Sequence, residues 1–183
     1  MALRPTREDL ARAVDKTVRD VLAPSLDVVF CGINPGLYTA AVGHHFARPG
    51  NRFWPTIHKA GFTPRLYSPL EDESLLEIGI GITNVVARAT VAAAELTPAE
   101  LREGAEILKK KMRKFAPRFL AIVGIGAYQL GFDRPKAKMG LQPDIIGGAT
   151  RIWVLPNPSG LNANYRPAEL VKVYGELRDA MLR

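Results

Sequence analysis

Two short uncharged segments of this 183-residue sequence contain the asparagines that are its best candidates for chemistry. One runs from Gly32 to Gly36 around Asn34, and the other runs from Asn157 to Asn162. An asparagine amide can orient a water molecule or a ligand through hydrogen bonds, but it is too weak a base to take a proton. Each segment alone is also typical of a tight turn, because proline fixes φ and glycine supplies positive φ.

The remaining residue types exclude several other kinds of site. A single cysteine, Cys31, excludes a disulfide framework and a four-cysteine metal cluster, and we expect it to be an inert buried residue. The histidines are not spaced as metal ligands. Neither a Walker phosphate loop nor a dinucleotide fingerprint is present, so a small-molecule nucleotide-binding protein is the weakest hypothesis. We therefore predict a protein with no metal and no cofactor.

The charge balance favours an anionic partner, and nucleic acid is one such partner. Lysine and arginine number 25 against 18 acidic residues, which gives a formal net charge of +7. The longest uncharged run, residues 28–47, contains a proline and three glycines, which argues against a membrane helix. The first ten residues carry four charges and no apolar signal sequence, so we expect a cytoplasmic protein.

Hydrophobic patterns predict the elements that must position the two asparagines. Apolar runs predict four strands, at residues 26–31, 80–86, 119–124 and 151–155. Helical periodicity and caps predict helices at residues 6–22, 52–60, 71–77, 97–115 and 127–130, and from Pro167 onward. Strands that alternate with helices predict a single three-layer α/β/α domain over residues 1–183, with a central, mostly parallel four-stranded sheet and residues 1–22 as a helical extension.

The predicted sheet brings both candidate segments to one edge. In such sheets a ligand binds beyond the carboxyl ends of the strands, so the loops that begin at Gly32, Asn84 and Pro156 should meet there. The stretch from Gly32 to Asn51 has no period and is expected to be one long loop of functional importance. Leu161, between a glycine and an asparagine, is an odd residue for an exposed turn and suits a wedge that enters between DNA base steps.

Taken together, these motifs resemble the uracil-DNA glycosylase superfamily. They are most similar to its mismatch-specific branch, the bacterial G:U/T glycosylases related to thymine-DNA glycosylase. The resemblance covers about Leu22 to Leu182. It rests on three motifs in order, which are Val29–Leu37, Asn51–Trp54 and Ile152–Leu161.

The resemblance implies roles for the residues of the base pocket. Asn34 matches the catalytic asparagine that positions the attacking water, and Asn157 matches the residue that faces O2 of the pyrimidine. Phe46 matches the aromatic residue that stacks on the flipped base. Gly36 stands where strict uracil enzymes place a tyrosine, which implies room for 5-substituted pyrimidines. The implied substrate-binding set is Ile33, Gly36, Phe46 and Asn84.

The second motif implies a DNA contact. Leu161 matches the intercalating wedge, and the implied DNA-binding residues around it are Ser159, Gly160, Leu161 and Asn162. The implied function is that of a monofunctional glycosylase, a monomer that flips uracil, and by extension thymine or damaged pyrimidines, out of mismatched double-stranded DNA. It would hydrolyse the N-glycosidic bond in base excision repair.

Several alternatives stay open at this stage. The second hypothesis is a non-catalytic module that binds mismatches or abasic sites on the same fold. It stays open because Ala163 stands where relatives often have an arginine, and because Ala92 to Ala94 offer no polar side chain at the expected active-site face. Arg52 is equally suited to contact phosphate or to anchor its loop. Phe53 and Trp54 are expected in the core beneath that loop.

Overall fold

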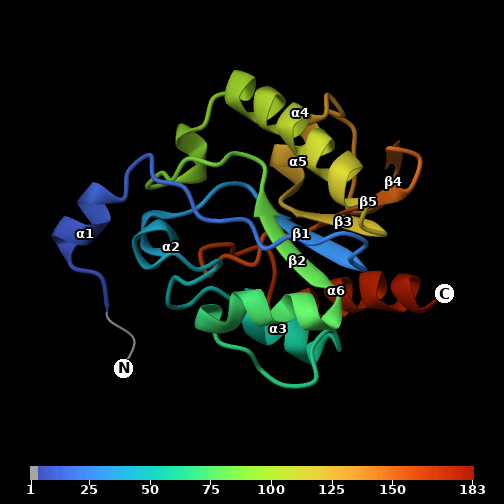
Figure 1. The fold of residues 1–183 in the computed structure, drawn as a ribbon, viewed down its shortest axis with the longest axis horizontal. Helices are drawn as coiled ribbons and strands as arrows, with labels where there is room; N and C mark the ends of the chain where they lie inside the picture. Colours follow the sequence, from blue (N-terminus) through green and yellow to red (C-terminus); the bar gives the residue numbers. More distant parts are fainter. Residues whose placement is uncertain (1–3) are drawn as a thin grey trace.

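The computed structural model describes residues 4–183 as a mixed α/β fold around a five-stranded sheet (Figure 1). The strand order is β2-β1-β3-β5-β4, and the first four strands in that order pair in parallel. The strands are β1 (Val28–Gly32), β2 (Ile80–Asn84), β3 (Phe119–Val123), β4 (Gly140–Ile146) and β5 (Thr150–Leu155). The predicted mostly parallel sheet is confirmed.

The prediction of four strands is wrong, because the sheet contains a fifth strand, β4, that the sequence pattern does not indicate. This edge strand runs antiparallel to β5, and its pairing shifts register between Leu141 and Ile145. It contains Pro143 and alternates between exposed and more buried residues, so it lacks the continuous apolar run that marks a buried strand. A proline is tolerated there because an edge strand has one side without sheet partners.

Helices cover both faces of the sheet and separate its strands. The helical segments are α1 (Arg7–Arg12), α2 (Leu37–Val42), α3 (Phe53–Lys59), the 3₁₀ helix η1 (Pro69–Ile78), the 3₁₀ turn η2 (Ala93–Glu95), α4 (Pro98–Phe115), α5 (Ile125–Gly131) and α6 (Pro167–Leu182). The region expected to be one loop, residues 32–51, therefore contains α2. No helix within residues 4–183 combines the length and the apolar character that crossing a bilayer requires.

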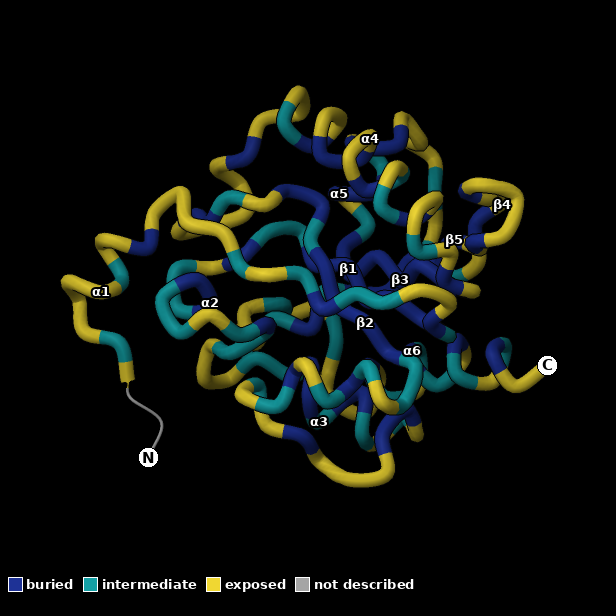
Figure 2. The backbone as a smooth tube through the Cα atoms, in the orientation of Figure 1, coloured by how far each residue is buried: buried dark blue, intermediate teal, exposed yellow. Residues whose placement is uncertain are grey.

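Two hydrophobic cores define three layers. Along β1, Val28 and Phe30 face the core that contains α3 and α6, whereas Val29 and Cys31 face the core that contains α4 and α5. This period of two persists although every residue of β1 is buried, because successive side chains of a strand point to opposite faces. Figure 2 shows the sheet as the buried centre of the molecule.

The N-terminal extension is not the single helix that the sequence predicted. The capping box of Thr6 and Asp9 forms, but α1 ends at Arg12, and Asp15 adopts a positive φ of 62°. Val21 then pairs antiparallel with Ile82, exchanging backbone hydrogen bonds of 2.9 and 2.8 Å. The segment therefore covers the exposed edge of β2, and pairing with that edge outweighs helical periodicity.

Helix α4 approaches the end of β2 very closely. A Cβ added to Gly104 would lie 2.3 Å from the carbonyl oxygen of Val85, whereas a Cβ added to Gly175 in α6 would meet nothing within 4 Å. Alanine in a helix interior is more stable than glycine by about 0.5–1 kcal/mol. The close approach reverses this preference at Gly104, because overpacking costs about 1–3 kcal/mol.

We predict that Gly104→Ala lowers the free energy of unfolding by about 1–2 kcal/mol, whereas the matched Gly175→Ala raises it by up to about 1 kcal/mol. Urea denaturation of both variants measures the difference. Stabilisation by both substitutions would contradict the close packing of α4 on β2.

Candidate active site at the carboxyl ends of the strands

Three loops leave the sheet at the carboxyl ends of β1, β2 and β5, on the side of the molecule where α1 and α2 lie (Figure 1). Two backbone hydrogen bonds extend the pairing of β1 with β2 into these loops. Val85 donates to the Gly32 carbonyl and Val86 donates to the Ile33 carbonyl, both at 2.9 Å. The loop that follows β2 is therefore held against the segment that contains Asn34.

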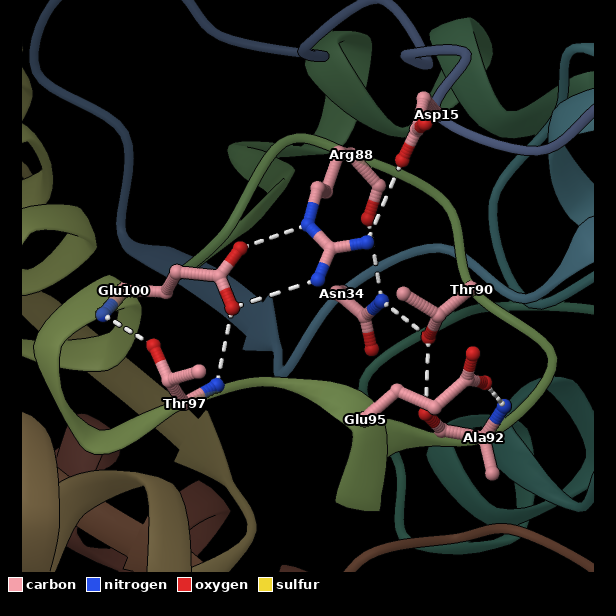
Figure 3. A network of polar contacts seen from close by, with 8 residues as sticks. All are labelled: Asp15, Asn34, Arg88, Thr90, Ala92, Glu95, Thr97 and Glu100. Carbon is pink, nitrogen blue, oxygen red and sulfur yellow. Dashed lines mark hydrogen bonds and ion pairs between the residues drawn. The ribbon is translucent and has the colours of Figure 1, made fainter.

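The amide of Asn34 is fixed by two acceptors. Its Nδ2 donates to the Arg88 carbonyl at 3.0 Å and to the Thr90 hydroxyl at 2.8 Å (Figure 3). The Thr90 hydroxyl uses its single proton to donate to the Ala92 carbonyl at 2.9 Å, so it can only accept from Asn34. Both partners of Asn34 accept, and its NH₂ group must face them. Its Oδ1 points away and has no hydrogen-bond partner within residues 4–183.

An ion-pair network supports the Arg88 backbone (Figure 3). The Arg88 guanidinium donates to Glu100 at 2.6 and 3.2 Å and to Asp15 at 3.2 Å. The hydrogen bonds from Arg88 and from the Thr97 backbone lower the pKa of Glu100 to about 2. Because the pKa of Glu100 is lower in the folded protein than its ordinary value of 4.5, its ion pair contributes stability above about pH 4.5, and this contribution is lost as the pH falls toward 2.

Phe46 and Asn84 both lie close to Gly32 at the end of β1. The Phe46 ring stacks on Phe53 with centroids 4.0 Å apart and an interplanar angle of 21°. A Cβ added to Gly32 would lie 2.5 Å from Asn84 Oδ1 and 3.5 Å from Phe46 Cζ. Glycine at position 32 therefore allows Asn84 to approach the end of β1 closely, whereas the distance to Phe46 is that of an ordinary van der Waals contact.

The other two predicted pocket residues differ in their surroundings. Gly36 is exposed, and a Cβ added there would meet nothing within 4 Å, so the space beside it is open. Ile33 packs instead toward Gly124, where an added Cβ would lie 3.0 Å from Ile33 Cδ1. Ile33 is half-buried beside the core that contains α4 and α5. Its side chain therefore packs against this core and anchors the loop to it.

Asn157 is fixed in the opposite sense to Asn34. Its Oδ1 accepts from the Ser159 N–H at 2.9 Å, and its backbone carbonyl accepts from Asn162 Nδ2 at 3.0 Å. Because a backbone N–H can only donate, the side-chain oxygen of Asn157 must face Ser159. The NH₂ group of Asn157 has no hydrogen-bond partner within the described residues, so it remains a donor that can serve a ligand.

The loop that carries Leu161 is anchored by Arg52. The Arg52 guanidinium donates to four backbone carbonyls, which are Pro158 at 3.4 Å, Ser159 at 2.6 Å, Asn162 at 3.0 Å and Tyr165 at 2.6 Å. Gly160 sits so close to the Gly50 carbonyl that an added Cβ would lie 2.6 Å from its oxygen. Leu161 stays 76% exposed at the tip. Of the two roles left open for Arg52, its hydrogen bonds fit the anchor.

Asp72 and Trp54 hold the turn before Phe46 in place. Both histidines of this loop contact the buried Asp72, His44 through Nδ1 at 3.0 Å and His45 through its backbone N–H at 3.0 Å. Burial lowers the pKa of His45, which favours its neutral form. Trp54 donates to the His45 carbonyl at 3.2 Å and is buried beneath the loop, as expected.

The sequence did not identify Arg88 and Thr90 as partners of Asn34. Both follow the second strand, but no spacing in the sequence links them to a residue more than fifty positions earlier. The structure places no group of three or more His, Cys, Asp or Glu side chains that could hold a metal within residues 4–183. Cys31 is fully buried, and burial raises the pKa of its thiol.

A mostly parallel sheet with a polar site beyond its carboxyl ends is typical of α/β enzymes and ligand-binding proteins. The family model of the uracil DNA glycosylase superfamily matches residues 19–178, and the chain belongs to this superfamily. A solution NMR structure from Methanosarcina acetivorans, of a protein suggested to be a uracil DNA glycosylase, is similar in fold. It has a TM-score of 0.55 and 19% identity, over 90% of this chain and 99% of that chain.

We predict that Arg52→Gln lowers the free energy of unfolding by roughly 2–4 kcal/mol, because four carbonyls lose a charged donor. Hydrogen exchange at the amides of Leu161 and Asn162 should become faster. The exposed Arg48 in the same turn provides the control, and Arg48→Gln should change stability by less than about 0.5 kcal/mol. Equal effects of the two substitutions would contradict the anchoring role of Arg52.

Proposed function

We propose that the protein is a monofunctional, mismatch-specific uracil DNA glycosylase of base excision repair. The observation that carries this proposal is the opposite orientation of two asparagine amides at one edge of the sheet. Asn34 offers an acceptor, which suits an attacking water, and Asn157 offers a donor, which suits the O2 atom of a departing pyrimidine. Membership of the uracil DNA glycosylase superfamily supports the same reading.

In the proposed reaction the target base leaves the helix and stacks against Phe46. The bond between C1′ and N1 breaks, and its electron pair stays on the base, which becomes an anion. A donor aimed at O2 stabilises this charge as it develops, so Asn157 lowers the barrier. Water held by Asn34 Oδ1 then adds to C1′, and its proton neutralises the departing base or passes to solvent. The products are the free base and an abasic site.

The residues of the site also suggest limits on rate and product. Asn34 cannot accept the proton of the water, so we expect slow turnover compared with an enzyme that has a carboxylate at this position. None of the site side chains named above is a lysine. We therefore expect no Schiff base with the sugar and no strand cleavage by the protein.

Substrate preference follows from the energy of flipping and from the space beside Gly36. Flipping a base costs a few kcal/mol, and the cost is lower for a mismatched pair, so G:U should be favoured over A:U. The open space at Gly36 leaves room for a substituent on C5, so we include thymine and damaged pyrimidines in the proposed range. Leu161, presented by Ser159, Gly160 and Asn162, would enter the duplex and hold the flipped state.

A non-catalytic module that binds mismatches or abasic sites is the second candidate. Ala92 to Ala94 are exposed and provide no polar side chain. Ala163, in the loop that carries Leu161, is exposed as well. This candidate predicts salt-sensitive binding of duplex DNA without release of a base. The first experiment below separates the two.

We predict single-turnover excision of uracil from a labelled duplex, fastest at G:U and slower at A:U, read as alkali-labile sites. Asn34→Ala should reduce the rate by about 10²-fold or more, while duplex affinity changes less than about threefold, or 0.7 kcal/mol. Asn164→Ala, in the exposed part of the Leu161 loop, should retain excision and serves as the matched control.

Undiminished excision by Asn34→Ala would remove Asn34 from the mechanism. Retained duplex binding with no excision at all by the unaltered protein would establish the binding module instead. Equal rates at G:U and A:U would contradict the mismatch preference alone.

A further inference from the structure

A large cavity lies between the N-terminal extension and α2. Its volume is about 850 Å³, and its walls come from the extension, from α2 and from the start of η1. The extension residues that line it all precede residue 19, where the match to the superfamily begins. We call this cavity the N-terminal cleft, and its lining includes Arg4, Asp9, Arg12, Lys16, Tyr38 and Leu70.

The wall formed by the extension is held firmly against the active-site loops. Asp15 donates its N–H to the Ala89 carbonyl at 3.0 Å, and Ala89 donates to the Lys16 carbonyl at 2.8 Å. Ala13 and Ala89 are fully buried and form a small apolar cluster with Ala40 of α2. The N-terminal cleft is therefore a built feature of the fold, fixed relative to the loop that orients Asn34.

The N-terminal cleft carries an excess of positive charge. Arg4, Arg12 and Lys16 line it, against the single carboxylate of Asp9. Hydrogen bonds from Thr6 lower the pKa of Asp9, and that carboxylate is already engaged in the cap of α1. Arg12 forms an ion pair with Glu8, whereas the ion pairs of residues 4–183 include neither Arg4 nor Lys16. Two exposed cations thus remain for an anionic ligand.

The position of the N-terminal cleft links it to the base pocket. Its other wall includes Tyr38, two residues after Gly36, and Ala47, directly after Phe46. Figure 1 shows α1 beside α2 on the side where the chain leaves the strands, and Figure 2 shows α1 as largely exposed. A DNA strand whose base enters the pocket would pass close to this side of the protein.

We propose that the N-terminal cleft binds the sugar–phosphate backbone of the DNA strand that carries the flipped nucleotide. This proposal rests on the proposed function, because it takes DNA as the ligand. Arg4 and Lys16 pair with phosphates that flank the target nucleotide, and the half-buried Tyr38 gives the sugar a packing surface. The extension then adds phosphate contacts beyond those of the matched superfamily region.

The test measures the affinity of a fluorescent G:U duplex over a range of salt concentrations. Each phosphate contact contributes about 0.9 to the slope of log K against log salt. Arg4→Ala combined with Lys16→Ala should therefore reduce the slope by about 1–2 and weaken binding. Lys110→Ala combined with Lys114→Ala removes the same charge from exposed sites on the last turns of α4, and it should leave the slope unchanged.

Two readouts separate this proposal from the proposed function. If slope and affinity fall only in the cleft variant, the proposal stands, whether or not the protein excises uracil. Excision by the unaltered protein together with equal slopes in both double variants would overturn the cleft proposal alone. Inorganic phosphate at millimolar concentration and equal ionic strength distinguishes a site for free phosphate. If it displaces the duplex from the unaltered protein but not from the cleft variant, DNA phosphates occupy the cleft; if it binds the unaltered protein but not the cleft variant and displaces no duplex from either, the assignment to a DNA strand is wrong.

Discussion

The candidate site depends on one constraint. The oxygen of an amide side chain can only accept a hydrogen bond, and its NH₂ group can only donate one. At Asn34 the neighbours are two acceptors, so the NH₂ group is occupied and the oxygen is available. At Asn157 the neighbour is a donor, so the oxygen is occupied and the NH₂ group is available. Hydrogen-bond complementarity alone thus turns two identical residue types into one acceptor and one donor.

The rest of the fold serves to keep these two orientations. Parallel pairing of β1 with β2 brings the loop that carries Thr90 against Asn34, and the ion pair of Arg88 with Glu100 fixes the carbonyl that completes the clamp. On the other side, Arg52 gathers four carbonyls of the loop that begins at Asn157. Neither asparagine ionises, so the geometry around Asn34 should vary little with pH until Glu100 is protonated as the pH falls toward 2.

The sequence predicts features that depend on local pattern and misses those that depend on distant partners. Buried strands, the capped helix α4 and the asparagine motifs are local, and the superfamily could be predicted from them. The edge strand β4 was missed because it is only partly buried and contains Pro143. The helix predicted to continue to Leu22 is wrong because Val21 pairs with the edge of β2, and Thr90 was missed because only the fold brings it to Asn34.

The most direct test of this account is a double-mutant cycle between Thr90 and Asn34, read as the single-turnover rate of uracil excision at G:U. Thr90→Val keeps the shape but removes the acceptor, and loss of about 1.4 kcal/mol should lower the rate about tenfold, whereas Thr90→Ser should restore it. In an Asn34→Ala background, Thr90→Val should change the rate less than about twofold, because its effect passes through Asn34. Equal losses in both backgrounds would contradict the claim that the orientation of this amide governs the site.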